Sequence, residues 1–307
     1  MRLFALLCGL VVCEAMVGGL SSCLAQELGA SDAVVVPDAV RIERPTTDEI
    51  ALAEKALASF VASADPQTKA VLTKFPSLLE VRAPRPNSAI IPDLARQFRQ
   101  KHEGNVAIAK EGKAEVLFLG DSITDFWRNE RGPFAGKEVF EKYYGDMEVA
   151  NFGIAGDTTQ GVLYRLLHGE GEGFSPRAVM LMIGTNNTGR NTGPEIAEGI
   201  GAVVHQLRQS FPEAKILLLG IFPRSGANDP VRKTIAEINA SIAKLDDGES
   251  VHYLDIGDKF LDDQGNIPKD IMADGLHPSA KGYEIWAEAV KEPLAELVGL
   301  EVAASGN

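Results

Sequence analysis

The chain has 307 residues, of which 45% are hydrophobic and 24% are charged, a composition typical of a globular protein with one sizeable core. Its formal net charge is -13, and the sequence contains no run of lysine or arginine. We therefore expect no nucleic-acid partner, because nothing would attract a phosphate backbone. The length predicts one main domain with an extension.

Residues 1–25 have the pattern of a signal peptide. Arg2 precedes an apolar run that is too short, and too interrupted by Glu14, to predict a membrane span. Two processing sites fit the sequence: ordinary cleavage after Ala25, or a bacterial lipoprotein box in which Cys23 would be lipidated. Either one predicts an exported protein, periplasmic or extracellular, with a lipid anchor only in the second case.

All three cysteines, Cys8, Cys13 and Cys23, lie in this leader. The mature domain therefore has no disulfide, no thiol nucleophile and no cysteine ligand for a metal. Its chemistry must come from oxygen and nitrogen side chains, and we expect neither a metal nor an organic cofactor.

Residues 26–95 are predicted to form an N-terminal tether and helical extension. Residues 26–45 are polar, contain proline and lack a period, which indicates a mobile or surface segment. Thr46, with Glu49 three positions on, predicts the capped start of an amphipathic helix, and a second helix should begin after Asp65. The simplest expectation is that these helices pack on the main domain. Covering its cleft or forming a dimer contact are the alternatives.

Residues 96–300 alternate helical stretches with short apolar runs, a pattern that predicts a parallel sheet with helices on both faces. Residues 301–307 are left as a tail. The expected strands are Val116–Leu119, Met147–Phe152, Ala178–Ile183, Lys215–Gly220 and Val251–Asp255, with the third in the centre. The expected helices cover about 157–167, 194–210, 230–246 and 279–298. We predict an α/β fold, a three-layer α/β/α sandwich with a five-stranded parallel sheet of flavodoxin-like winding.

Three polar segments follow the first three predicted strands. Ser122 stands where the first strand turns into a helix, and a serine there is often only a helix cap. Gly156 belongs to a loop after the second strand, where it either serves the turn or lets its N–H approach a ligand oxygen. Asn186, after the third strand, caps a loop or directs its amide at an oxyanion.

A fourth segment, Asp274-Gly275-Leu276-His277, lies just before the last helix. This spacing allows the Asp274 carboxylate to reach one imidazole nitrogen while the other acts as a base. Two such residues make no metal site, since no further histidine is placed to join them. All four segments should meet at one edge of the sheet, which favours a catalytic site over four separate turns. The serine lacks the G-x-S-x-G pattern of α/β-hydrolases.

These segments resemble the conserved blocks of the SGNH (GDSL-type) hydrolase family: G-D-S, G-D-T, G-x-N-[DN] and D-x-x-H, in the same order. The resemblance implies that Ser122 is the nucleophile and that Asp274 and His277 complete a catalytic triad. It also implies an oxyanion hole made by the backbone N–H groups of Ser122 and Gly156 and the side chain of Asn186.

Within this family, residues 152–159, 184–187 and 219–224 are similar to segments of the intracellular platelet-activating-factor acetylhydrolase catalytic subunits, a likeness that covers about residues 100–296. Those enzymes have no export signal, so their substrate does not carry over. The sequence predicts an exported esterase for short acyl groups, acetyl in particular, on a glycan or another alcohol. A lipase or lysophospholipase, a carbohydrate O-acetyltransferase and a non-catalytic binding module are alternatives. The oligomeric state stays open.

Overall fold

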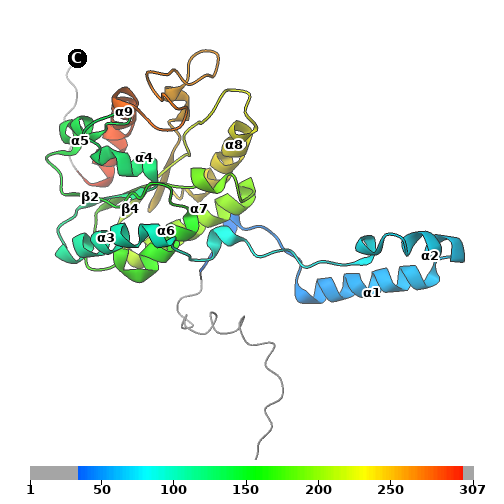
Figure 1. Ribbon diagram of the computed structural model, residues 1–307. Helices are drawn as coiled ribbons and strands as arrows, with labels where there is room; N and C mark the ends of the chain where they lie inside the picture. Colours follow the sequence, from blue (N-terminus) through cyan, green and yellow to red (C-terminus); the bar gives the residue numbers. More distant parts are fainter. Residues whose placement is uncertain (1–33, 300–307) are drawn as a thin grey trace, which may run out of the picture. The chain divides into compact units, whose positions relative to one another are not determined.

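The computed structural model describes residues 34–299, and a five-stranded parallel sheet lies at the centre of this part (Figure 1). The strand order is β2-β1-β3-β4-β5, which is the predicted flavodoxin-like winding with the third strand in the middle. The strands are β1 Val116–Gly120, β2 Val149–Asn151, β3 Ala178–Met182, β4 Lys215–Leu219 and β5 Val251–Leu254. Each begins and ends within one residue of its predicted bounds, except that β2 begins two residues later than predicted.

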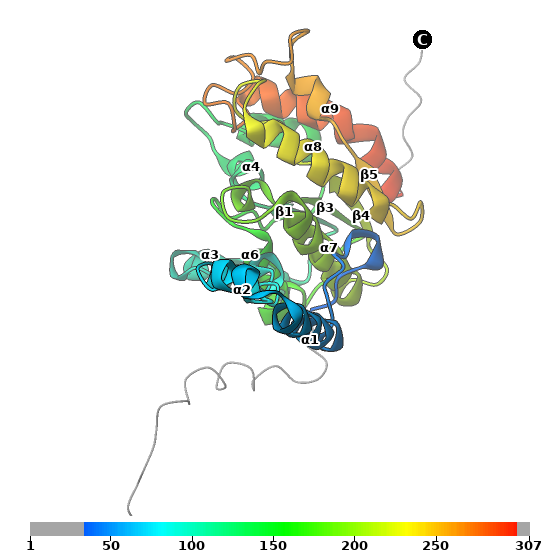
Figure 2. The same ribbon diagram turned by 90° about the vertical axis from the view of Figure 1, so that its right-hand side faces the viewer.

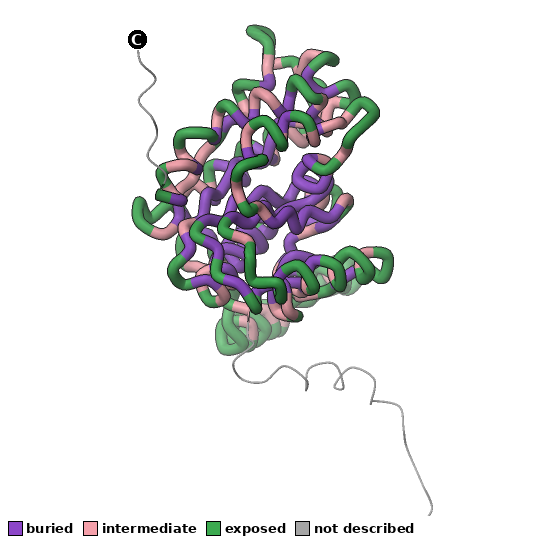
Figure 3. Tube along the Cα trace, turned by 90° about the vertical axis from the view of Figure 1, so that its left-hand side faces the viewer, coloured by how far each residue is buried: buried purple, intermediate pink, exposed green. Residues whose placement is uncertain are grey.

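Helices cover both faces of the sheet (Figures 1 and 2). The helices on one face are α3 Arg99–Glu111, α6 Thr159–Arg165, α7 Gly193–Ser210 and α8 Pro230–Ile242. Those on the other are α4 Ser122–Asp125, α5 Lys137–Tyr144 and α9 Ala280–Leu297. Leu117 packs on the first face and its neighbour Phe118 on the second, so the central strands are buried on both sides (Figure 3). This explains their unbroken apolar runs.

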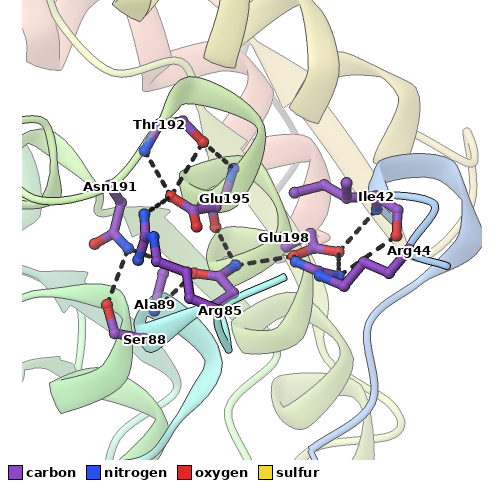
Figure 4. Close-up of polar contacts among 10 residues, drawn as sticks. Ile42, Arg44, Arg85, Ser88, Ala89, Asn191, Thr192, Glu195 and Glu198 are labelled. Carbon is purple, nitrogen blue, oxygen red and sulfur yellow. Dashed lines mark hydrogen bonds and ion pairs between the residues drawn. The ribbon is translucent and has the colours of Figure 1, made fainter. Parts of the chain in front are cut away.

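The segments that flank the predicted helical extension are attached to α7. Val40, expected in a surface tether, is only 7% exposed and packs in the core. Its single 3-10 turn is too short to produce a recognisable period. Arg44 forms an ion pair with the buried Glu198, whose carboxylate also accepts a hydrogen bond from Ile42 N at 2.8 Å (Figure 4). Arg85 pairs with Glu195 at 2.8 Å, so both ends of the extension are held on one helix.

The extension itself contains α1 Thr47–Ser63 and α2 Pro66–Leu72, and both helix starts are as predicted. Thr46 Oγ1 accepts from Glu49 N at 3.2 Å, and the Glu49 carboxylate accepts from Thr46 N at 2.8 Å. No residue of either helix is buried, so the expected packing on the main domain is absent from the described structure. The apolar face of α1 instead lines a groove with Leu79 and Val81 of the same extension.

The predicted signal peptide (residues 1–25) and tail (301–307) lie outside the described residues and stay predictions. Within residues 34–299, no helix has the length and apolar character that crossing a membrane requires.

Candidate active site

Ser122 is presented by a tight turn between β1 and α4. A side chain at Gly120 would place its Cβ 2.4 Å from the carbonyl oxygen of Met182, so only glycine fits there. Asp121 caps α4 by accepting a hydrogen bond from Ile123 N at 3.0 Å. Ser122 is therefore the first helical residue, and its N–H has no acceptor within the helix. The hydroxyl and the N–H of Ser122 therefore both lie at the carboxyl end of β1.

His277 joins Ser122 to Asp274 through its two ring nitrogens. Its Nε2 lies 2.9 Å from Ser122 Oγ, and its Nδ1 lies 2.7 Å from Asp274 Oδ2. Partial burial raises the pKa of Asp274, but hydrogen bonds from His277 and Leu276 outweigh it and leave the pKa below its ordinary value. An ionised carboxylate only accepts, so Nδ1 carries the proton and Nε2 is free to accept one from the serine.

The turn that holds Asp274 and His277 is fixed by backbone contacts. Asp274 Oδ1 accepts from His277 N at 2.8 Å, which fixes the two side chains relative to each other. Gly275 O accepts from Ser225 N at 2.8 Å, and Ser225 has a positive φ of 59°. The loop after β4 therefore supports this turn. Sequence reasoning missed Ser225, because no local pattern marks a serine held in this conformation.

Gly156 and Asn186 supply hydrogen-bond donors near the end of β1. Ile154 N donates to Gly120 O at 3.2 Å, which brings the loop of Gly156 against the turn of Ser122. Gly156 has φ +86°, and its N–H has no acceptor among residues 34–299. Asn186 Nδ2 donates to Asp157 O at 2.8 Å and keeps its second hydrogen. Gly156 and Asn186 thus lie on the loops that follow β2 and β3, the two strands that flank β1.

A buried ion pair holds the loop that contains Gly156. Arg165 is fully buried, and its Nε donates to Asp157 Oδ2 at 2.9 Å. Its Nη1 pairs with Glu170, which is also fully buried. Two buried carboxylates thus share the single positive charge of this guanidinium, and Glu170 also lies 2.9 Å from His102 Nδ1. The sequence pointed to Asp157 alone, since the other two residues match no motif.

A second arginine ties two loops of the site together. Arg128 donates to the carbonyl oxygens of Asn151 and Gly153, both at 2.8 Å, and pairs with Asp125 at 2.5 Å. Asp125 Oδ2 in turn accepts from Ala155 N at 3.0 Å. These contacts join α4 to the loop of Gly156. They involve backbone groups, which explains why sequence patterns did not reveal them.

Aromatic rings flank the imidazole of His277. The centroids of Phe126 and Phe134 lie 5.1 Å and 5.0 Å from its ring, and the two phenyl rings stack with an interplanar angle of 12°. Trp127 is fully buried and packs on Trp286 instead. Phe126 therefore adjoins the site and Trp127 belongs to the core. Phe134 was missed, because it lies in a loop with no motif.

A cavity of about 320 Å³ opens beside Gly156 and Asn186. Its other lining residues are Asp93, Ala95, Gln97, Phe98, Asp157, Thr158, Gln160 and Arg190. Most of these side chains are polar. The wall formed by residues 93–98 comes from the segment between the helical extension and α3.

The fold and these segments define an esterase of a known class. The sequence profile of the GDSL-like lipase/acylhydrolase family matches residues 118–285, more than half of the chain, and the chain belongs to this family. It is a carboxylic ester hydrolase of the SGNH/GDSL type, as the resemblance of its four segments predicts.

Relatives and solved structures agree with this membership. The platelet-activating factor acetylhydrolase IB subunit alpha2 of Rattus norvegicus is 34% identical over 222 residues, covering 69% of this chain and 90% of the relative. A Bacteroides fragilis protein described as a candidate acylhydrolase shares the fold at 18% identity, with a TM-score of 0.53 over 67% of this chain and all of the other. A Streptococcus pneumonia protein described as a candidate platelet activating factor has 22% identity and a TM-score of 0.52, over 64% and 94% of the two chains.

Proposed function

We propose that this protein is an exported serine esterase that removes short acyl groups, acetyl in particular, from a polar alcohol such as a carbohydrate. The observation that carries the catalytic part is the continuous chain from Ser122 Oγ through the imidazole of His277 to Asp274. This is the arrangement that activates a serine hydroxyl for acyl transfer.

In the proposed mechanism, Ser122 Oγ attacks the ester carbonyl carbon while His277 Nε2 takes the hydroxyl proton. The tetrahedral intermediate places its negative oxygen among the N–H groups of Ser122 and Gly156 and the amide of Asn186. The carbon–oxygen bond to the alcohol then breaks, and His277 returns the proton to the departing oxygen. Water attacks the acyl-serine by the same route and releases the carboxylic acid.

The acetyl group and the polar alcohol are each supported by one observation. The rat relative, 34% identical, bears the name of an acetylhydrolase. The cavity beside Gly156 and Asn186 is lined mainly by polar groups, which suit a polar alcohol. A lipid esterase is the second candidate, because the family that the chain belongs to is described as lipases and acylhydrolases.

The proposal is tested by the rates at which the mature domain hydrolyses p-nitrophenyl acetate, butyrate and octanoate, alongside acetate release from acetylated xylan. We expect the highest kcat/KM for acetate and measurable release from the glycan. A preference for octanoate would identify a lipid esterase. Transfer of acetyl to an added sugar would identify an acetyltransferase, and absence of any turnover would revive the binding module.

Export rests on residues 1–25 and is proposed from the sequence alone. Expression of the full chain in a bacterial host, followed by mass analysis of the mature N-terminus, tests it. A start at Gln26 corresponds to ordinary cleavage, and a lipidated Cys23 corresponds to the lipoprotein alternative. An intact leader in the cytoplasmic fraction would contradict export.

A further inference from the structure

The cavity beside Gly156 and Asn186 has one wall that the family profile does not include. The profile begins at residue 118, whereas Asp93, Gln97 and Phe98 precede it. This wall is held in place: Asp93 N donates to Gln160 O at 3.2 Å, and Ala89 O accepts from Thr159 Oγ1 at 2.8 Å. The segment is therefore fixed against the first turn of α6, and it forms a defined surface.

The side chains on this wall and opposite it are available to a ligand. Asp93, Gln97 and Arg190 are exposed, and within residues 34–299 none of the three forms a side-chain hydrogen bond or an ion pair. Gln160 accepts from Asn187 through its Oε1, which leaves its Nε2 hydrogens unused in the described structure. The cavity thus combines a carboxylate, a guanidinium and amides, which both donate and accept.

Phe98 adds an apolar surface next to this polar set. A Cβ at Gly156 would lie 3.4 Å from Phe98 Cζ, so the ring reaches the backbone of Gly156. Alternating hydroxyl and C–H surfaces of a sugar ring match a site of this kind, in which polar groups surround one aromatic face. Because the negative charge of Asp93 offsets the positive charge of Arg190, this pair does not favour an anionic ligand over a neutral one.

We propose that this cavity is a subsite for a neutral glycosyl unit, bound through its hydroxyl groups by Asp93, Gln97 and Arg190. This inference rests on the proposed acetylesterase function. When the acyl group is acetyl, only a methyl group extends on the acyl side of the carbonyl. The polar cavity of about 320 Å³, which Gly156 and Asn186 line and Ser122 does not, is then available to the alcohol part of the ester, and its volume is at the lower end of small-molecule sites.

The test compares two acetyl esters that differ only in the alcohol: p-nitrophenyl acetate and acetylated xylo-oligosaccharide. Gln97→Ala and Arg190→Ala should each lower the ratio of kcat/KM for the sugar ester to kcat/KM for p-nitrophenyl acetate. We expect the ratio to fall about tenfold for each variant, the effect of one or two lost hydrogen bonds. The change should appear in KM for the sugar, because these contacts bind the ground state as well.

Two exposed residues that do not line the cavity serve as matched controls: Gln100→Ala in the first turn of α3 and Arg96→Ala in the wall segment should leave the ratio unchanged. Equal losses on both substrates, or no loss on the sugar ester, would overturn the subsite. Wild-type turnover of p-nitrophenyl acetate separates the two proposals. If the wild type hydrolyses p-nitrophenyl acetate but not the acetylated sugar, the subsite proposal is wrong and the esterase proposal is supported. If it hydrolyses neither ester, the esterase proposal is wrong.

Discussion

The imidazole Nε2 of His277 lies 2.9 Å from the hydroxyl of Ser122, although 155 positions separate the two residues in the chain. Ser122 follows β1 and begins α4, whereas His277 precedes α9. Helices α4 and α9 pack on the same face of the sheet. Tyr283 of α9 donates to Ile123 O at 2.8 Å, so the helix that follows the histidine also holds the turn of the serine. The proposed base and the proposed nucleophile are thus positioned by the same packing.

Asp274→Asn is expected to lower kcat for p-nitrophenyl acetate by about 10²- to 10⁴-fold with little change in KM. The asparagine amide can donate to Nδ1, which would favour the tautomer whose Nε2 cannot accept the serine proton. Steady-state kinetics check this result. A fall of less than tenfold in a folded variant would show that His277 does not depend on Asp274.

Asn186→Ala should reduce kcat about 10²-fold while KM changes little, because its amide hydrogen bond strengthens as charge develops on the carbonyl oxygen. Asn228→Ala, an exposed asparagine in the loop before α8, is the matched control and should behave like the wild type. An effect of Asn186→Ala confined to KM would assign this residue to substrate binding instead.

The buried Asp121 predicts a dependence of stability on pH. Burial raises its pKa to about 7, against hydrogen bonding from Ile123 N, so the folded protein holds a proton that the unfolded chain loses near pH 4. Protonated Asp121 therefore makes its full contribution to the free energy of unfolding below pH 4. This contribution decreases as the pH rises to 7, by about 1.4 kcal/mol per pH unit at most. Asp121→Asn keeps an acceptor for Ile123 N and removes this slope.

Urea unfolding at several values between pH 4 and pH 7 measures that slope for both proteins. The wild type should lose stability relative to Asp121→Asn as the pH increases. Parallel curves for the two proteins would mean that Asp121 is ionised throughout this range.

Arg165→Met should destabilise the fold by about 3 to 5 kcal/mol, because it leaves Asp157 and Glu170 buried without their shared cation. Chemical denaturation gives the free energy of unfolding. Lys137→Met, which removes an exposed partner of Glu130, is the control and should be close to the wild type. Equal stability of Arg165→Met and the wild type would contradict the structural role of this ion pair.

The fold could be predicted because the strands are buried on both faces, so that runs such as 178–182 carry an unbroken apolar signal. The four segments of the site could be predicted for a related reason, since each follows a strand or precedes a helix and the parallel sheet brings them to one edge. The attachment of residues 34–44 to α7 was not predictable, because it depends on single long-range contacts such as that of Arg44 with Glu198. The exposed state of α1 was not predictable either, since its apolar pattern does not say which surface it meets.

The initial rate of p-nitrophenyl acetate hydrolysis by the wild type and by Ser122→Ala, at equal concentrations of folded protein, tests the central claim most directly. Ser122 is 6% exposed, and losing one oxygen atom should not unfold the domain, which circular dichroism can verify. We predict that the variant loses at least about 10⁴-fold in kcat, as removal of a nucleophile does in serine hydrolases. A folded variant that keeps most of the wild-type rate would contradict the assignment of Ser122 as nucleophile.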